Sequence, residues 1–163
     1  MANPEHLEIL KKGVEVWNKW RVENENVIPV LIEATLKGAN LDGANLESAD
    51  LTGANLELVN LTGARLDGAK LDGANLGEAS LKGATLSWAS LEVANLTWAN
   101  LLGANLQGAT LTRAHLGGAN LTWAQLGGAN LSNAFVGYTI FTEIDFSNIK
   151  GLETINHINP SEI

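Results

Sequence analysis

The chain has 163 residues, enough for one domain with a buried core, and its lack of cysteine excludes disulfides, thiolate metal sites and a cysteine nucleophile. A formal net charge of −8 leaves no excess of lysine and arginine to neutralise phosphates, which argues against direct nucleic-acid binding. No apolar run is long enough to span a bilayer, and the N-terminal segment lacks the pattern of a secretory signal, so a soluble cytoplasmic protein is expected.

The N-terminal segment has the pattern of a helix over residues 4–23. Asn3 suits the N-cap and Pro4 the first helical position. Apolar residues then follow at 3–4–3 spacing: Leu7, Leu10, Val14 and Trp17. We expect residues 1–33, this helix and its lead-in, to cap the following segment. The alternative is a membrane-surface or partner-binding helix, which the mixed charges of the polar face disfavour.

A strict five-residue repeat follows the helix. Leucine stands at every fifth position from Leu36 to Leu131, twenty in all. Alanine lies two residues before each of them, with Val59 as the one replacement, and asparagine often lies between. Since side chains alternate along a strand, alanine and leucine point to one side and asparagine to the other. The last two residues of each unit, often ending in glycine, must then turn the chain.

Four such units close into a square coil of 20 residues, and successive coils should stack as parallel strands. Leucine fills the interior, and alanine fits where the walls come close. No proline occurs between residues 34 and 133, as expected if backbone N–H groups join the coils. The repeats continue less regularly through Val136, Phe141 and Phe146, which predicts about six coils over residues 34–148.

The run ANLDGANLESADLTGANL resembles the pentapeptide-repeat family, over about residues 34–148. The resemblance implies an all-β solenoid, a right-handed quadrilateral parallel β-helix, here with an N-terminal α-helical cap. The segments GVEVWNKWRVEN and KGLETINHINPSEI are similar to the flanks of stand-alone members from photosynthetic bacteria.

The C-terminal segment changes character at Phe135, where aromatic and β-branched residues replace the alanine–leucine pattern. Leu152, Ile155 and Ile158 recur every third residue, which suits a short turn or helix folded over the last coil. We therefore expect residues 149–163 to form a C-terminal capping tail.

Catalytic, cofactor and metal sites are not expected. The three histidines, His6, His115 and His157, fall in separate parts of the predicted fold. Glu47 and Asp67, like Asp72 and Glu92, should be one coil apart, which is close enough for paired carboxylates. Their convex outer wall offers no cleft to separate the two pKa values, so an enzyme is not expected.

Apolar residues at outward positions form the candidate protein interface. Trp98, Leu102 and Trp123 are predicted near one corner of the rod, and Trp88 and Val93 near the opposite corner. Exposed tryptophan is enriched in interfaces, although it also shields corners. Stacked asparagines such as Asn40 and Asn60 are expected to form ladders that support the fold.

The favoured function is a non-catalytic structural or protein-interaction module with an unknown protein partner, acting as a monomer or weak oligomer. The alternative comes from the family resemblance: a DNA mimic that binds DNA gyrase or another DNA-binding protein. Mimicry requires dense negative charge, because a duplex carries one charge per about 1.7 Å. Residues 34–133 hold eight acidic and five basic residues, and residues 96–133 hold Arg113 as their one charge.

Overall fold

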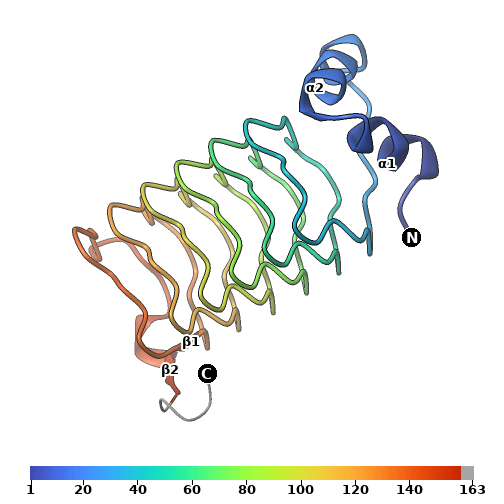
Figure 1. The fold of residues 1–163 in the computed structure, drawn as a ribbon. Coiled ribbons are helices and arrows are strands. Elements are labelled where there is room, and N and C mark those ends of the chain that lie inside the picture. Colours follow the sequence, from blue (N-terminus) through green and yellow to red (C-terminus); the bar gives the residue numbers. More distant parts are fainter. Residues whose placement is uncertain (159–163) are drawn as a thin grey trace.

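The computed structural model describes residues 1–158. Figure 1 shows a stack of four-sided coils with two helices at its N-terminal end. Each residue that points outward from a wall pairs in parallel with the residue 20 positions later, from Val30 with Asp50 to Asn130 with Lys150. One coil therefore contains 20 residues, as the five-residue repeat predicts. The extended part of each side is so short that these pairs are isolated bridges and not continuous strands.

Backbone hydrogen bonds explain why the repeat has five residues. In the unit around Leu61, four N–H groups donate to main-chain carbonyls: Asn60 to Ala39, Leu61 to Ser80, Gly63 to Lys82 and Ala64 to Leu61, at 2.7–3.0 Å. The fifth, that of Thr62, donates to Oδ1 of Asn60 at 3.1 Å. The outward asparagine thus accepts from the one N–H that the coil-to-coil ladder does not use, as side chains of this type commonly do in turns.

The interior is filled by the repeated leucines and alanines. Leu51, Leu86 and Leu111 are 0% exposed, and Ala54 and Ala84 fill the space near the walls to the same extent. The inward assignment of both residue types is confirmed. Fully burying a leucine contributes about 1.5–3 kcal/mol, so the column of leucines is the main source of stability.

Two helices, not one, occupy the N-terminal segment. Helix α1 covers Pro4–Lys11 and α2 covers Val14–Glu23, with Asn3 accepting from the N–H of Glu5 as the N-cap of α1. The prediction of a single helix over residues 4–23 is wrong at Gly13. This residue has a φ of 111°, a conformation open to glycine and outside the helical region.

The C-terminal segment departs from the 20-residue register. Strand β1 (Phe135–Val136) pairs in parallel with β2 (Asn156–His157), so that Phe135 meets Asn156, 21 residues later. The 3₁₀ helix Leu152–Thr154 precedes β2 and supplies the short helix expected there. Residues 159–163 of the expected tail lie outside the described residues.

Candidate interaction surface

The turn that ends each pentapeptide places one residue in the left-handed backbone region. Glycine is common there, but Trp88, Val93, Trp98 and Trp123 occupy it with φ values of 58–60°. Each non-glycine residue in this conformation costs about 1–2 kcal/mol. The four side chains are 45–77% exposed, whereas Leu102, one position earlier in its turn, is half-buried. The corners of the rod therefore display large apolar side chains to solvent.

Two of these tryptophans cover a glycine in the next coil. The ring of Trp88 lies against Gly108 and that of Trp98 against Gly118, so a Cβ on either glycine would overlap the indole. These glycines are required by both their positive φ and the ring above them. Trp88 and Trp98 thus shield backbone, which gives them a structural role whether or not a partner contacts them.

The five candidate interface residues occupy more corners than predicted. Trp98 and Trp123 are 25 residues apart, which is one coil of 20 plus one side, so they lie on different corners. Trp88 and Val93, five residues apart, likewise occupy successive corners. The prediction of two shared corners is wrong because a step of five residues moves the chain one side around the coil. The structure brings together only Leu102 and Trp123, in adjoining positions of successive coils.

Shallow hollows lie beside two of the tryptophans. The hollow at Trp98 has a volume of about 200 Å³ and is also lined by Glu57, Gly77 and Glu78. The hollow at Trp123 has a volume of about 280 Å³ and includes Gln107, Gln125, Gly127, Glu143 and Asp145 in its lining. A glycine with an ordinary φ opens each wall, because it leaves the outward position without a side chain.

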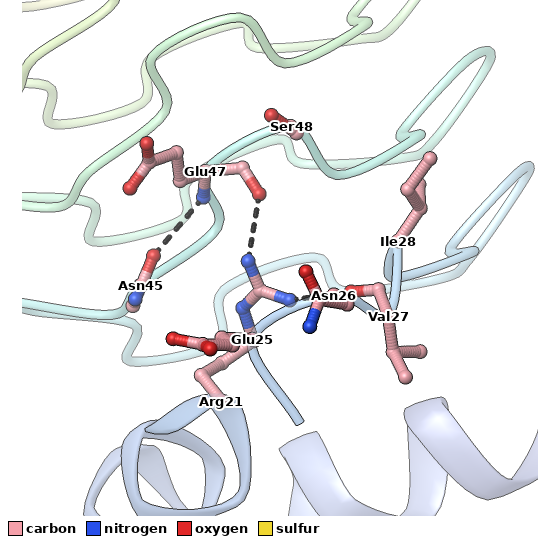
Figure 2. A pocket seen from close by; sticks show the side chains of 8 residues that line it. All are labelled: Arg21, Glu25, Asn26, Val27, Ile28, Asn45, Glu47 and Ser48. Atoms are coloured by element: carbon pink, nitrogen blue, oxygen red, sulfur yellow. Dashed lines mark hydrogen bonds between the residues drawn. The ribbon is translucent and has the colours of Figure 1, made fainter. Parts of the chain in front are cut away.

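A third hollow, of about 370 Å³, lies between α2 and the first coil (Figure 2). The Arg21 guanidinium donates to the carbonyl of Val27 at 2.7 Å and to that of Glu47 at 3.0 Å. Its Nε is buried and has no partner among the described residues. Burial lowers the pKa of Arg21, and the nearby Glu47 carboxylate acts in the opposite direction.

Side chains of α2 take the place of a preceding coil. The Trp17 Nε1–H donates to the carbonyl of Asn45 at 2.8 Å, and Asn18 Oδ1 accepts from the N–H of Asn45 at 2.8 Å. With the Arg21 bond to Glu47, they satisfy three groups that bond to the preceding coil elsewhere in the rod. An open parallel edge would otherwise be free to pair with another chain.

Helix α1 closes another side of the first coil. The buried His6 accepts from the N–H of Val30 through Nδ1 at 3.0 Å, and its ring packs on Trp20. Burial lowers the pKa of His6, with Glu5 raising it and Arg21 lowering it. The neutral imidazole is the form that can accept this bond.

The carboxylates singled out in the sequence replace missing asparagines. Residues 85 and 90 are Thr85 and Ser90, so the N–H two residues later lacks its usual acceptor. Asp67 Oδ1 accepts from the N–H of Ser87 at 3.0 Å, one coil on, and also bonds to Thr85. Asp72 does the same for Glu92 and Ser90. Their position is explained by backbone satisfaction and not by acid–base chemistry.

Comparison with known proteins identifies the family. A sequence profile of pentapeptide repeats matches residues 30–68, 60–92 and 94–128. The chain belongs to the pentapeptide-repeat family. Proteins of this family form right-handed quadrilateral β-helices, in agreement with the four-sided coils described above. The match covers the regular coils and ends before the segment in which the repeat becomes irregular.

Several solved pentapeptide-repeat structures are similar. The protein Rfr23 from the cyanobacterium Cyanothece 51142 is 32% identical over 82% of this chain and 96% of its own, with a TM-score of 0.60. A pentapeptide-repeat protein from the Arabidopsis thaliana thylakoid lumen is 29% identical over 52% of this chain, with a TM-score of 0.50, and the match spans 59% of that protein. No curated protein sequence matches this chain.

The remaining histidine and membrane predictions can be set against this pentapeptide-repeat fold. His115 stacks on Phe135 in the next coil with ring centroids 4.6 Å apart, as expected of a side chain in an outward ladder. Within residues 1–158, no three histidine, aspartate or glutamate side chains gather in a way that would hold a metal ion. No helix in the same range is long and apolar enough to cross a membrane.

Sequence reasoning missed Asn18, Arg21 and His6 as contacts to the first coil. Trp17 was assigned to an apolar stripe, and its polar Nε1–H was not considered. A usable signal exists, because the first coil of a parallel stack must find donors and acceptors outside the repeat. Polar side chains at positions 17, 18 and 21, on one side of a helix next to that coil, can supply them.

Proposed function

We propose that the protein is a non-catalytic interaction module, a rigid rod whose outer wall binds a protein partner. The observation that supports this most directly is the exposed indole of Trp123. It is 63% exposed, stands beside a hollow and, unlike Trp88 and Trp98, covers no glycine. A large aromatic side chain held in a costly backbone conformation without a packing role is typical of a binding surface.

The architecture of the wall also favours binding over catalysis. Leucine and alanine fill the interior, and the most prominent hollows among the described residues lie on the outside of the rod. Enzymes commonly enclose their substrates in concave, largely apolar pockets that exclude water. A stiff wall with fixed corners is better suited to a protein surface, because little conformational entropy is lost on binding.

The DNA-mimic alternative is less well supported by the charge pattern. Acidic residues are sparse where the rod is most regular, and residues 96–133 carry one charge, on Arg113. This wall does not reproduce the dense and even negative charge of a duplex. We therefore favour a partner that binds the apolar corners over one that ordinarily binds DNA.

We also propose that the N-terminal helices are a cap that keeps the first coil from pairing with another rod. The bonds from Trp17, Asn18 and Arg21 to the first coil support this function. A cytoplasmic location and a monomeric or weakly oligomeric state remain predictions.

Affinity capture from the native host tests the interaction function. Tagged wild-type protein should retain a partner that the Trp98→Ala/Trp123→Ala variant loses, because both exposed indoles are removed from the wall. Val22→Ala, which changes a 77% exposed residue of α2, is the control and should retain it. Equal recovery by all three proteins would place the partner elsewhere, and reproducible absence of any partner would contradict the function.

A further inference from the structure

The hollow at Trp123 differs from the other tryptophan sites in what surrounds the ring. Trp88 and Trp98 lie over Gly108 and Gly118, whereas the residue one coil beyond Trp123 is Glu143. The indole therefore stands beside a carboxylate-bearing turn instead of covering backbone. Its left-handed conformation, with a φ of 58°, holds the ring at the corner.

Two carboxylates line this hollow. Glu143 and Asp145 are contributed by the irregular last coil, and neither forms an ion pair within residues 1–158. Asp145 accepts from the N–H of Ser147 at 2.9 Å, and hydrogen bonding to Ser147 lowers the pKa of its carboxyl. Carboxyl side chains are ordinarily ionised at neutral pH, so the hollow is negatively charged. No lysine or arginine lines it.

Side-chain amides complete the polar part of the wall. Gln107 donates to Gln125 at 3.4 Å, and Gly127 leaves the space above them open, since a Cβ there would meet nothing within 4 Å. The hollow thus combines an aromatic face, two carboxylates and amide acceptors. Cations bind to indole faces, and guanidinium groups donate in parallel to carboxylates.

We propose that the Trp123 hollow binds an arginine side chain from a basic segment of a protein partner. The guanidinium would lie on the indole and donate to Glu143 and Asp145, with the amide oxygens accepting its remaining N–H groups. This inference rests on the proposed interaction function and adds the chemistry of the partner. Charge complementarity favours this occupant, because residues 134–163 hold four acidic residues and one basic residue.

Titration with a defined peptide tests the proposal without the native partner. The probe is acetyl-Gly-Arg-Gly-Arg-Gly-amide, and its control replaces both arginines by citrulline, which has the same shape without the charge. Indole ¹⁵N–¹H spectra resolve the five tryptophans, and Trp123→Phe assigns the relevant signal. The Trp123 signal should shift saturably with the arginine peptide, and more weakly as salt is raised.

Three variants of the full chain make the test specific. Glu143→Gln/Asp145→Asn keeps the hydrogen-bonding shape and should weaken binding by about five-fold or more. Gly127→Gln should fill the hollow without backbone strain and abolish the shift. Asp42→Asn/Glu92→Gln removes the same charge from exposed positions elsewhere and should bind as wild type. The other indole signals report that each variant is folded.

Two results would overturn the proposal. One is an unmoved Trp123 signal, and the other is an equal response to the citrulline peptide or an equal loss in both charge variants. Either result leaves the interaction function intact if the native partner is still captured. Failure of that capture alongside a specific shift would instead contradict the proposed function while supporting the arginine site.

Discussion

At the scale of single residues, each position of the pentapeptide has its own physical task. Leucine and alanine fill the interior, asparagine accepts from the turn N–H, and the left-handed position favours glycine. These tasks were predictable because strand alternation fixes which side chains point inward. The role of Asp67 was not predictable from its own unit, since it depends on Thr85 in the next coil.

The interior assignment predicts unequal costs for truncation. Leu86→Ala should lower the free energy of unfolding by about 2–5 kcal/mol, because the stacked coils cannot close around the cavity. The matched change at the outward Gln107 should alter it by no more than about 0.5 kcal/mol. Chemical denaturation measures both, and similar losses at the two positions would contradict the inward and outward assignments.

The carboxylate of Asp67 is expected to be replaceable. Asp67→Ala should cost about 1 kcal/mol of unfolding free energy, because the N–H of Ser87 loses its acceptor. Adding Thr85→Asn should restore most of this loss by supplying the usual acceptor two residues earlier. Denaturation of the single and double variants tests it. If the added Thr85→Asn change fails to restore stability, Asp67 must act through another contact.

At the scale of elements, the N-terminal segment shows what the amphipathic pattern could and could not specify. The apolar stripe correctly indicated helix and its burial against the rod. It did not locate the break, because the stripe continues across Gly13 while the backbone does not. Nor did it reveal that Trp17 and Arg21 contact carbonyls of the first coil, since hydropathy ignores hydrogen bonds.

The contact between His6 and Val30 predicts a loss of stability in acid. Because the pKa of His6 is lowered from 6.5, the unfolded chain binds the proton more readily than the folded chain. The contribution is present above that pH and is lost as pH falls through the folded value. Thermal unfolding from about pH 7.5 to pH 5 should show this decline, and His6→Gln should reduce it. An unchanged profile in the variant would assign the decline to other groups.

At the scale of the whole molecule, the sequence specified the coil but not its contact surface. The five-residue period and the 20-residue coil follow from the spacing of twenty leucines. Assigning corners requires position in the 20-residue register, and the grouping of Trp98 with Trp123 failed on this point. The slip at Phe135–Asn156 was also hidden, because it depends on how the 3₁₀ helix Leu152–Thr154 takes up one extra residue.

Removing the N-terminal helices should change the state of assembly. Deletion of residues 1–26 would expose the backbone groups of Asn45 and Glu47 together with one end of the core. We expect end-to-end oligomers or aggregates, because open parallel edges pair with one another. Size-exclusion chromatography with light scattering measures this, with Val22→Ala as a folded control. A stable monomer would assign the helices to a partner or a membrane surface instead.

The single N–H left over in each pentapeptide means that the rod has a frame of proline tolerance. Of the five frames, only the position after leucine lacks a ladder bond, and it is also a turn position where proline is favoured. Lys82→Pro should therefore raise the free energy of unfolding by about 0.4–1 kcal/mol. Asn100→Pro, which removes the donor to Ala79, should lower it by about 3 kcal/mol, and chemical denaturation compares the two. A set of substitutions of the first kind, one per coil, would stiffen the rod without touching its interior.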